Sequence, residues 1–256
     1  MQHSQDNYSP EEVQKFDQLA SRFWDQNSEF KTLHQVNPLR LEFIQEYLNK
    51  FNSKDNLKNQ ALTGLDIGCG GGILTEALAK KGLNMTGIDL APSVIKIAKL
   101  HLLETNLNQD QNSQLNINYQ QISAEDFLEN NKNIYFDFIT CMEMLEHVPN
   151  PESIIKTASD LLKPNGLIFF STLNRNLRSF LEAIIGAEYI LKILPKGTHT
   201  YEKFIKPEEL VSMARKFGLK PLEAREIKYD LFKKSFSLNT PKNKIRTNYM
   251  ICFEKI

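Results

Sequence analysis

A glycine-rich segment followed by an acidic residue is the pattern in this chain that points most directly to chemistry. Four glycines lie in the run LDIGCGGGIL at 65–74, and Asp89 follows seventeen positions after the last of them. Glycine lets the backbone turn sharply and approach a ligand where a Cβ would collide. A carboxylate at Asp89, at the end of a second strand, can accept hydrogen bonds from both hydroxyls of a ribose. The pattern therefore predicts a site for a nucleoside cofactor.

The spacing of these glycines distinguishes two kinds of nucleoside site. Dinucleotide enzymes favour Gly-x-Gly-x-x-Gly, whereas this run, with Asp66 in front of Gly68 and Gly70, resembles motif I of class I S-adenosylmethionine (SAM) methyltransferases. A predicted helix over 73–81 would direct its N-terminal N–H groups and positive dipole end toward the ligand. An ordinary tight turn is the alternative, for which one or two glycines would suffice. The candidate cofactor residues here are Asp66, Gly68, Gly70, Asp89 and Leu90.

A second group of polar residues follows the predicted strand 136–141. If Glu143 begins a helical turn, Glu146 and His147 lie three and four positions later, so all three side chains share one face. Two carboxylates and an imidazole could bind a hard divalent cation such as Mg2+, and His147 could alternatively act as a general base. The alternative is a solvated helix start, with acidic residues placed favourably near the helix dipole. Beside a cofactor loop, the catalytic interpretation is favoured.

Composition and charge indicate one cytoplasmic domain. The chain has 256 residues, 41% of them hydrophobic, which is enough for a substantial core without division into two domains. The 31 basic and 31 acidic residues cancel, so nothing in the balance indicates a nucleic-acid partner. Three scattered cysteines fit a reducing compartment. No apolar run reaches the roughly 18 residues of a membrane-spanning helix, and the N-terminus resembles neither a signal peptide nor a transit peptide.

After two N-terminal helices within 1–52, strands and helices alternate along the chain. Ser9, Pro10 and Glu12 predict a capping box at the start of the first helix. The alternation predicts an α/β fold with a mostly parallel sheet and helices on both faces, in which ligands bind beyond the carboxyl ends of the strands. The polar segment 105–114 is expected to be a surface loop. The predicted strands are 63–67, 84–88, 116–119, 136–141, 167–171, 221–229 and 248–254, and the predicted helices are 37–51, 73–81, 93–104, 151–162 and 207–217.

The segment 174–204 is an insertion that a minimal fold of this kind does not require. Apolar residues recur at helical spacing between 177 and 194, with arginines and lysines among them. This combination suits a helix that lies at a membrane surface. A lid helix packed on the protein's own core is the alternative, and both can hold in turn. The run Lys196–His199 could hinge such a lid.

Several longer runs are more specific than the glycine loop. They are Asn-Pro-Leu-Arg at 37–40, Met-Glu-Met-Leu-Glu-His at 142–147 and Ser-Thr-Leu-Asn-Arg-Asn at 171–176. In these runs the chain resembles the O-methyltransferases of ubiquinone biosynthesis, and the resemblance extends over nearly its whole length. Further matching stretches are 20–25, 30–34, 98–101, 140–149, 186–191 and 195–199.

The resemblance implies a class I methyltransferase fold, with a seven-stranded sheet whose last strand is reversed. It implies SAM-dependent O-methylation of phenolic hydroxyls on polyprenylated ubiquinone precursors, namely 2-polyprenyl-6-hydroxyphenol and 3-demethylubiquinol. Such a substrate implies that a cytoplasmic protein contacts the inner membrane peripherally, and a ubiquinone-biosynthesis complex is a further expected partner. Assistance by Mg2+, with Glu143, Glu146 and His147 as ligands, would resemble the eukaryotic branch of the family.

The resemblance also implies which residues contact the cofactor. The family's contacts carry over to Arg40, Gly68, Asp89 and Met142. Arg40 suits the methionine carboxylate of SAM, because a planar guanidinium binds a carboxylate bidentately. Met142 offers a soft apolar edge for adenine. Glu125 is a secondary candidate near the adenine amino group, where the local sequence departs from the pattern of bacterial members.

Other functions share parts of this pattern. An NAD-dependent oxidoreductase would share the sheet and Asp89, but the chain lacks its second half-domain and its glycine spacing. A catalytically inactive SAM-fold scaffold is disfavoured by the intact Asp89, Glu146 and His147. A methyltransferase that acts on another small phenol or catechol is the strongest alternative. The stretch 228–246 departs from the bacterial family pattern, and this bears on the wall of the substrate pocket more than on the chemistry.

Overall fold

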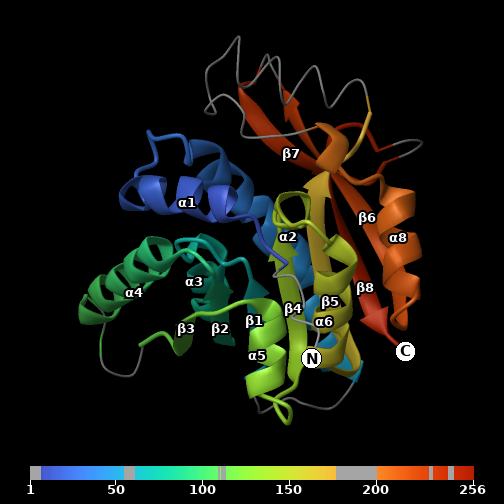
Figure 1. The fold of residues 1–256 in the computed structure, drawn as a ribbon, viewed down its shortest axis with the longest axis horizontal. Helices are drawn as coiled ribbons and strands as arrows, with labels where there is room; N and C mark the ends of the chain where they lie inside the picture. Colours follow the sequence, from blue (N-terminus) through green and yellow to red (C-terminus); the bar gives the residue numbers. More distant parts are fainter. Residues whose placement is uncertain are drawn as a thin grey trace.

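The computed structural model describes residues 7–54, 61–108, 110, 114–176, 201–230, 233–241 and 245–256. The strands are β1 (Thr63–Ile67), β2 (Asn84–Asp89), β3 (Ile117–Gln121), β4 (Phe136–Met142), β5 (Leu162–Leu173), β6 (Leu219–Asp230), β7 (Ser235–Asn239) and β8 (Asn248–Lys255). In the described part of the chain they form one eight-stranded sheet in the order β3-β2-β1-β4-β5-β8-β6-β7 (Figure 1). The first five strands pair in parallel, which confirms the predicted α/β class.

The end of the sheet differs from the prediction by one strand. As expected, the last strand of the chain is reversed, because β8 pairs antiparallel with both β5 and β6. The additional strand is β7, which forms an antiparallel edge on β6. Phe236 and Leu238 pack inward from β7, while its serines and asparagine are exposed. Only two apolar residues mark this short alternation, so the sequence does not predict the strand.

Helices cover both faces of the sheet. All seven residues of β4 are buried, and successive side chains therefore enter opposite cores. Phe138 packs with Phe43 and Leu78 on one face, whereas Ile139 packs with Ile155 and Leu210 on the other. The two layers are supplied by α2 (Lys31–Lys54) and α3 (Ile73–Ala79), and by α5 (Ala124–Asn130), α6 (Pro151–Leu161) and α8 (Pro207–Arg215).

The N-terminal segment forms a further layer beside the start of α4 (Pro92–Leu107). It consists of α1 (Pro10–Leu19), the 3₁₀ turn η1 (Ala20–Arg22) and a loop that leads into α2. Phe23 and Phe30 stack with their ring centroids 4.1 Å apart and pack with Val94 of α4. In Figure 1, α1 lies above α3 and α4, near the edge where the parallel strands end. Helix α1 is thus placed at the edge where a fold of this kind binds its ligands.

Several predicted boundaries move. The helix predicted over 93–104 continues to Leu107, so the first residues of the expected loop 105–114 are helical. The strand predicted over 167–171 begins already at Leu162, directly after α6. Most of the 174–204 insertion, residues 177–200, lies outside the described residues. None of the described helices is long and apolar enough to cross a membrane.

Candidate active site

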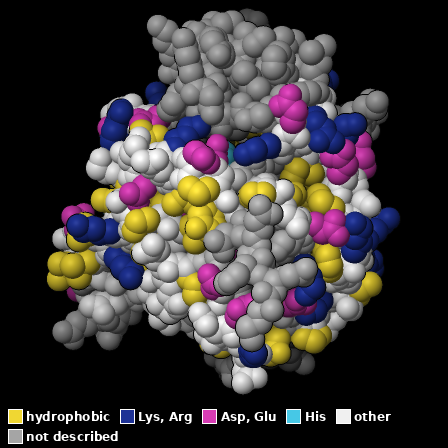
Figure 2. All heavy atoms as spheres, viewed as in Figure 1, with side chains coloured by type: hydrophobic (Ala, Val, Ile, Leu, Met, Phe, Trp, Pro, Cys, Tyr) yellow, Lys and Arg dark blue, Asp and Glu magenta, His cyan; other side chains and the backbone are white. Residues whose placement is uncertain are grey.

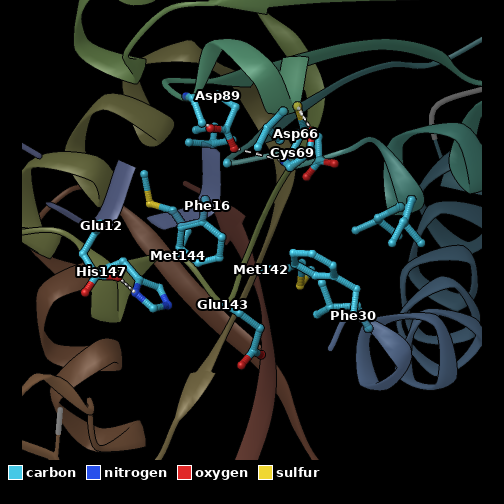
Figure 3. Close-up of a pocket in the computed structure, with 18 of the residues that line it drawn as sticks. Glu12, Phe16, Phe30, Asp66, Cys69, Asp89, Met142, Glu143, Met144 and His147 are labelled. Carbon is cyan, nitrogen blue, oxygen red and sulfur yellow. Dashed lines mark hydrogen bonds and ion pairs between the residues drawn. The ribbon is translucent and has the colours of Figure 1, made fainter. Parts of the chain in front are cut away.

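A cavity of about 1180 Å³ opens at the carboxyl edge of the parallel strands. Its walls come from α1, the glycine loop after β1, the ends of β2 and β4, the N-terminal half of α2, and the neighbouring ends of β6 and β7. Figure 3 shows Asp66 and Asp89 toward one end and the pair Glu12 and His147 toward the other. The cofactor residues predicted from sequence all line this cavity: Arg40, Asp66, Gly68, Gly70, Asp89, Leu90, Glu125 and Met142.

The glycine loop needs its glycines for two physical reasons. Gly68, Gly70 and Gly72 have φ values of 70°, 54° and 86°, a left-handed conformation that other residues adopt only with strain. The ring of Phe23 also lies directly on the loop, and a Cβ added at Gly71 would come within 2.5 Å of it. The loop is therefore shaped by its own backbone and by the N-terminal segment packed on it.

Asp89 lies where the sequence predicted it, at the end of β2 and on the cavity wall. Its Oδ2 accepts a hydrogen bond of 3.1 Å from the N–H of Gly70, and its Oδ1 accepts one of 2.9 Å from the N–H of Ala91. Burial raises the pKa of Asp89 above its usual value, although these N–H groups favour the carboxylate. The carboxylate is thus fixed against the loop, in the position from which it can bind ribose hydroxyls.

Asp66 has a different part in the site. It is only 2% exposed, and its two oxygens accept hydrogen bonds of 2.6 and 2.7 Å from the hydroxyls of Thr75 and Thr140. Burial raises its pKa to about 6. Because Thr75 belongs to α3 and Thr140 to β4, Asp66 ties the elements around the glycine loop together. Its side chain shapes the cofactor loop from behind.

Arg40 brings a positive charge into the cavity from α2. The residue is 6% exposed, its Nη2 lies 3.4 Å from Oε1 of Glu143, and its Nε has no hydrogen-bond partner among the described residues. A buried guanidinium with an unused donor fits a carboxylate ligand. Glu143 is held further by the hydroxyl of Ser171, at 2.7 Å, and by the amide of Asn248, at 3.2 Å. Asn248 is a cavity residue that the sequence analysis missed.

The predicted helical turn through Glu143 is wrong. Glu143 has a φ of 53°, so it lies outside the helical region, and the short helix η3 covers only Leu145–His147. Glu146 is 3% exposed and does not line the cavity; its Oε2 accepts a hydrogen bond of 2.8 Å from the hydroxyl of Thr172. Burial, and then the negative charge of Glu143, raise the pKa of Glu146 to about 7. The two carboxylates therefore do not share one face.

His147 is held by α1. Its Nδ1 lies 2.9 Å from Oε2 of Glu12, and its ring meets the ring of Phe16 edge to face at 5.4 Å between centroids. Burial lowers the pKa of His147, but the hydrogen bond that its ring donates to Glu12 and the charges of Glu146 and Glu12 outweigh this effect, so the pKa is raised. The predicted capping box is only half formed, since Ser9 accepts from the N–H of Glu12 while the Glu12 side chain turns to His147.

The three predicted Mg2+ ligands do not form a metal site in this arrangement. Glu143 binds Arg40 and its neighbours, Glu146 is buried against Thr172, and His147 faces Glu12. In Figure 3 the carboxylate of Glu143 points away from the imidazole of His147. Among the residues that the structure describes, no group of three or more His, Cys, Asp or Glu side chains could hold a metal ion. The donor set therefore does not fit Mg2+.

Glu125 is fixed at the far wall of the cavity. Its Oε1 accepts hydrogen bonds of 2.9 Å from the amide of Asn7 and 2.8 Å from the hydroxyl of Ser153. The carboxylate thus connects the N-terminal segment with α5 and α6.

On the molecular face shown in Figure 2, acidic and basic side chains of the described residues are interspersed, in keeping with the balanced charge of the chain.

Comparison with known proteins decides the family. A family model described as "Methyltransferase domain" matches residues 32–224. The ubiquinone biosynthesis O-methyltransferase of Colwellia psychrerythraea is 45% identical over 254 residues, covering 98% of each chain. That of Nitrosomonas europaea is 47% identical over 247 residues, covering 96% of this chain and 97% of its own. The chain belongs to the ubiquinone biosynthesis O-methyltransferase family.

This SAM-dependent O-methyltransferase also shares its fold with solved methyltransferases. Magnesium protoporphyrin IX methyltransferase from Synechocystis, solved with bound SAH, matches with a TM-score of 0.60 at 14% identity, covering 95% of this chain and 94% of that chain. A SAM-dependent methyltransferase from Methanosarcina mazei matches with a TM-score of 0.55 at 23% identity, covering 77% and 94%. The predicted family and fold are thus confirmed.

Proposed function

We propose that this enzyme methylates phenolic hydroxyls of polyprenylated ubiquinone precursors, with 2-polyprenyl-6-hydroxyphenol and 3-demethylubiquinol as its substrates. One observation carries the proposal: the glycine loop with Asp89 and the pair Glu12 and His147 line the same cavity. A cofactor on one side and a base on the other is the arrangement that methyl transfer to a phenol requires. The relatives from Colwellia and Nitrosomonas are ubiquinone biosynthesis O-methyltransferases, which supports a role in the same pathway.

The chemistry of the cavity wall supports one placement of the cofactor within this proposal. Asp89 receives the ribose hydroxyls, Arg40 pairs with the methionine carboxylate through its unused Nε, and Leu90 and Met142 offer apolar surface to adenine. SAM supplies an electrophilic methyl group together with its own leaving group. The protein therefore has to align the acceptor oxygen and remove its proton.

His147 is the proposed general base. An unperturbed phenol titrates near pH 10, so at neutral pH its proton must be removed during the reaction. Glu12 accepts the hydrogen bond from Nδ1, which fixes the tautomer in which Nε2 is the basic nitrogen. The negative charge of Glu12 also stabilises the imidazolium that forms when the proton arrives. Glu143, Glu146 and His147 are engaged in other contacts, so the proposed mechanism assigns them no Mg2+ ion.

The proposed substrate also implies contact with the membrane and with partner proteins. A polyprenyl tail partitions into the bilayer, so the enzyme reaches its substrate by peripheral contact with the inner membrane, as the basic and apolar character of segment 174–204 suggests. Assembly with other enzymes of the pathway would keep such apolar intermediates from dispersing. Liposome flotation of the intact enzyme, with and without residues 177–194, tests the membrane contact.

A deletion strain tests the substrate. Loss of the gene should abolish ubiquinone and lead to accumulation of a hydroxylated polyprenyl precursor, identified by its mass, and the wild-type chain should reverse both effects. The Asp89→Ala variant should fail to do so. If ubiquinone persists and no precursor accumulates, the proposed substrate is wrong.

Another small phenol or catechol is the second candidate substrate. Lys228, Tyr229 and Phe236 line the cavity in the stretch that departs from the bacterial family pattern. Purified enzyme offered a polyprenylated and an unprenylated catechol decides between them. A higher kcat/KM for the prenylated compound supports the first candidate, and the reverse order supports the second.

A further inference from the structure

We propose that Trp24 is a positioning residue that holds the glycine loop in its SAM-binding shape, and that it is itself held by His101 and the buried Glu76. All three side chains lie outside the cavity wall, and neither the family comparison nor the proposed mechanism gives them a role. The inference rests on the proposed function in one respect, namely that SAM binds over this loop.

The first contact joins Trp24 to the loop itself. The indole Nε1 donates a hydrogen bond of 2.9 Å to the carbonyl oxygen of Gly71. Gly71 lies between Gly70 and Gly72, which both have left-handed φ values, so its peptide group must keep one orientation for the loop to keep its shape. A donor fixed on this carbonyl opposes rotation of the peptide. The ring of the neighbouring Phe23 also packs directly against Gly71.

The second contact fixes the indole. The rings of Trp24 and His101 stack with centroids 3.3 Å apart and planes within 3°. Such a close, nearly parallel stack leaves the indole little freedom to turn. The imidazole is held in turn by a carboxylate at its Nδ1.

That carboxylate is Glu76. Its Oε1 lies 2.8 Å from Nδ1 of His101, and its side chain is 1% exposed. Its Oε2 accepts from the hydroxyl of Thr105 at 3.3 Å and lies 3.8 Å from the ammonium of Lys80. A carboxylate this deeply buried is kept only when it is paired. His101 and Thr105 belong to α4, so Glu76 fastens α4 to α3.

These contacts form a continuous series that begins and ends at the glycine loop. The loop carbonyl holds Trp24, Trp24 stacks on α4, and α4 is fastened to Glu76 of α3, the helix that starts directly after the loop at Ile73. Trp24 therefore supports the shape of the cofactor loop.

The test separates the N–H donor from the rest of the indole. Trp24→Phe keeps an aromatic ring for the stack but removes the hydrogen bond to Gly71. We expect the Kd for SAM and SAH, measured by calorimetry, to rise about fivefold, in line with the net contribution of one hydrogen bond. The KM for SAM should rise similarly while kcat changes less than twofold. An unchanged Kd in a folded Trp24→Phe variant overturns the proposal.

A matched control removes a comparable hydrogen bond elsewhere. The hydroxyl of Tyr47 donates 2.6 Å to Glu223, and Tyr47 does not line the cavity. Tyr47→Phe should lower the melting temperature without changing the Kd for SAH. If both variants weaken SAH binding equally, the effect is one of general stability and the proposal is wrong.

Trp24 is the only tryptophan of the chain, which provides a spectroscopic readout. His101→Leu, at a partly exposed position, removes the stacked imidazole. We expect stronger tryptophan emission in this variant and weaker SAH binding. In the wild type, SAH should change the emission with the Kd found by calorimetry. No response of emission to bound SAH overturns the proposal, whereas absence of SAH binding to the wild type overturns the proposed cofactor site as well.

Discussion

The imidazole of His147 and the carboxylate of Glu12 lie 2.9 Å apart although 135 positions separate them in the chain. The contact brings α1 against the segment that follows β4 and gives the N-terminal helix a place in the active site. A carboxylate on Nδ1 does two things to a histidine: it selects the tautomer, and it makes the other nitrogen more basic. Both effects can be measured separately.

The first prediction concerns the pH dependence of Glu12→Gln. Burial lowers the pKa of His147, but the hydrogen bond to Glu12 and the charges of Glu146 and Glu12 together raise it. A base must be neutral, so kcat/KM of the wild type should increase with pH through this raised pKa. Without the negative charge of Glu12 the pKa falls, and the acidic limb of the profile should move to lower pH. The plateau should drop about tenfold, because the ring loses its orientation.

Glu11→Gln is the control for this prediction. Glu11 is the neighbouring carboxylate, is fully exposed and does not line the cavity. Its profile should match that of the wild type. Equal profiles for Glu12→Gln and the wild type would show that Glu12 does not act on the reacting base.

Much of the fold could be predicted because local patterns determine it. The apolar run of β4 and the alternation of strands and helices specify a buried parallel sheet, and the glycines with Asp89 specify its ligand-binding edge. The strand β7 was not predicted, since two apolar residues in a serine-rich stretch are a weak periodic signal. Its position depends on pairing with β6, a contact that no local pattern reports.

The candidate site was predictable only where residues adjoin a recognisable motif. The left-handed φ of Glu143 could not be expected from its residue type. This backbone conformation turns the carboxylate toward Arg40, so that it does not share a face with Glu146. The local sequence predicts that Glu12 caps the helix. Its actual partner, His147, comes close only in the tertiary fold. Such long-range pairs leave no periodic or spacing signal in one sequence.

The second prediction concerns His147 itself. If it is the general base, His147→Gln should lower kcat by a factor of about 10² to 10⁴, while the Kd for SAH stays within twofold of the wild type. Formation of SAH from the phenolic substrate measures kcat, and calorimetry measures the Kd. Adding Glu12→Gln to this variant should then cause no further loss, because Glu12 acts through the imidazole. Additive losses would contradict this order of action.

The third prediction concerns Arg40. Arg40→Met keeps the bulk of the side chain on α2 but removes its charge, and the Kd for SAM should rise roughly 10- to 100-fold, as for a lost charged hydrogen bond. Arg40→Lys should recover part of the affinity. Arg215→Met is the control, since Arg215 is exposed on α8 and does not line the cavity. Equal SAM affinities in Arg40→Met and Arg215→Met would exclude a contact of Arg40 with the cofactor.

The fourth prediction concerns stability and Asp66. Burial raises its pKa to about 6 in the folded chain, against about 3.9 when unfolded. The folded state therefore holds this proton more tightly, and the stability it contributes at low pH is lost as pH rises from about 4 through 6. A shift of this size corresponds to about 3 kcal/mol. Asp66→Asn cannot ionise, and the hydroxyls of Thr75 and Thr140 can rotate to serve an amide. The free energy of unfolding, measured with urea in the absence of cofactor, should increase for Asp66→Asn relative to the wild type between pH 4 and 7. A difference that stays constant over this range would contradict the raised pKa.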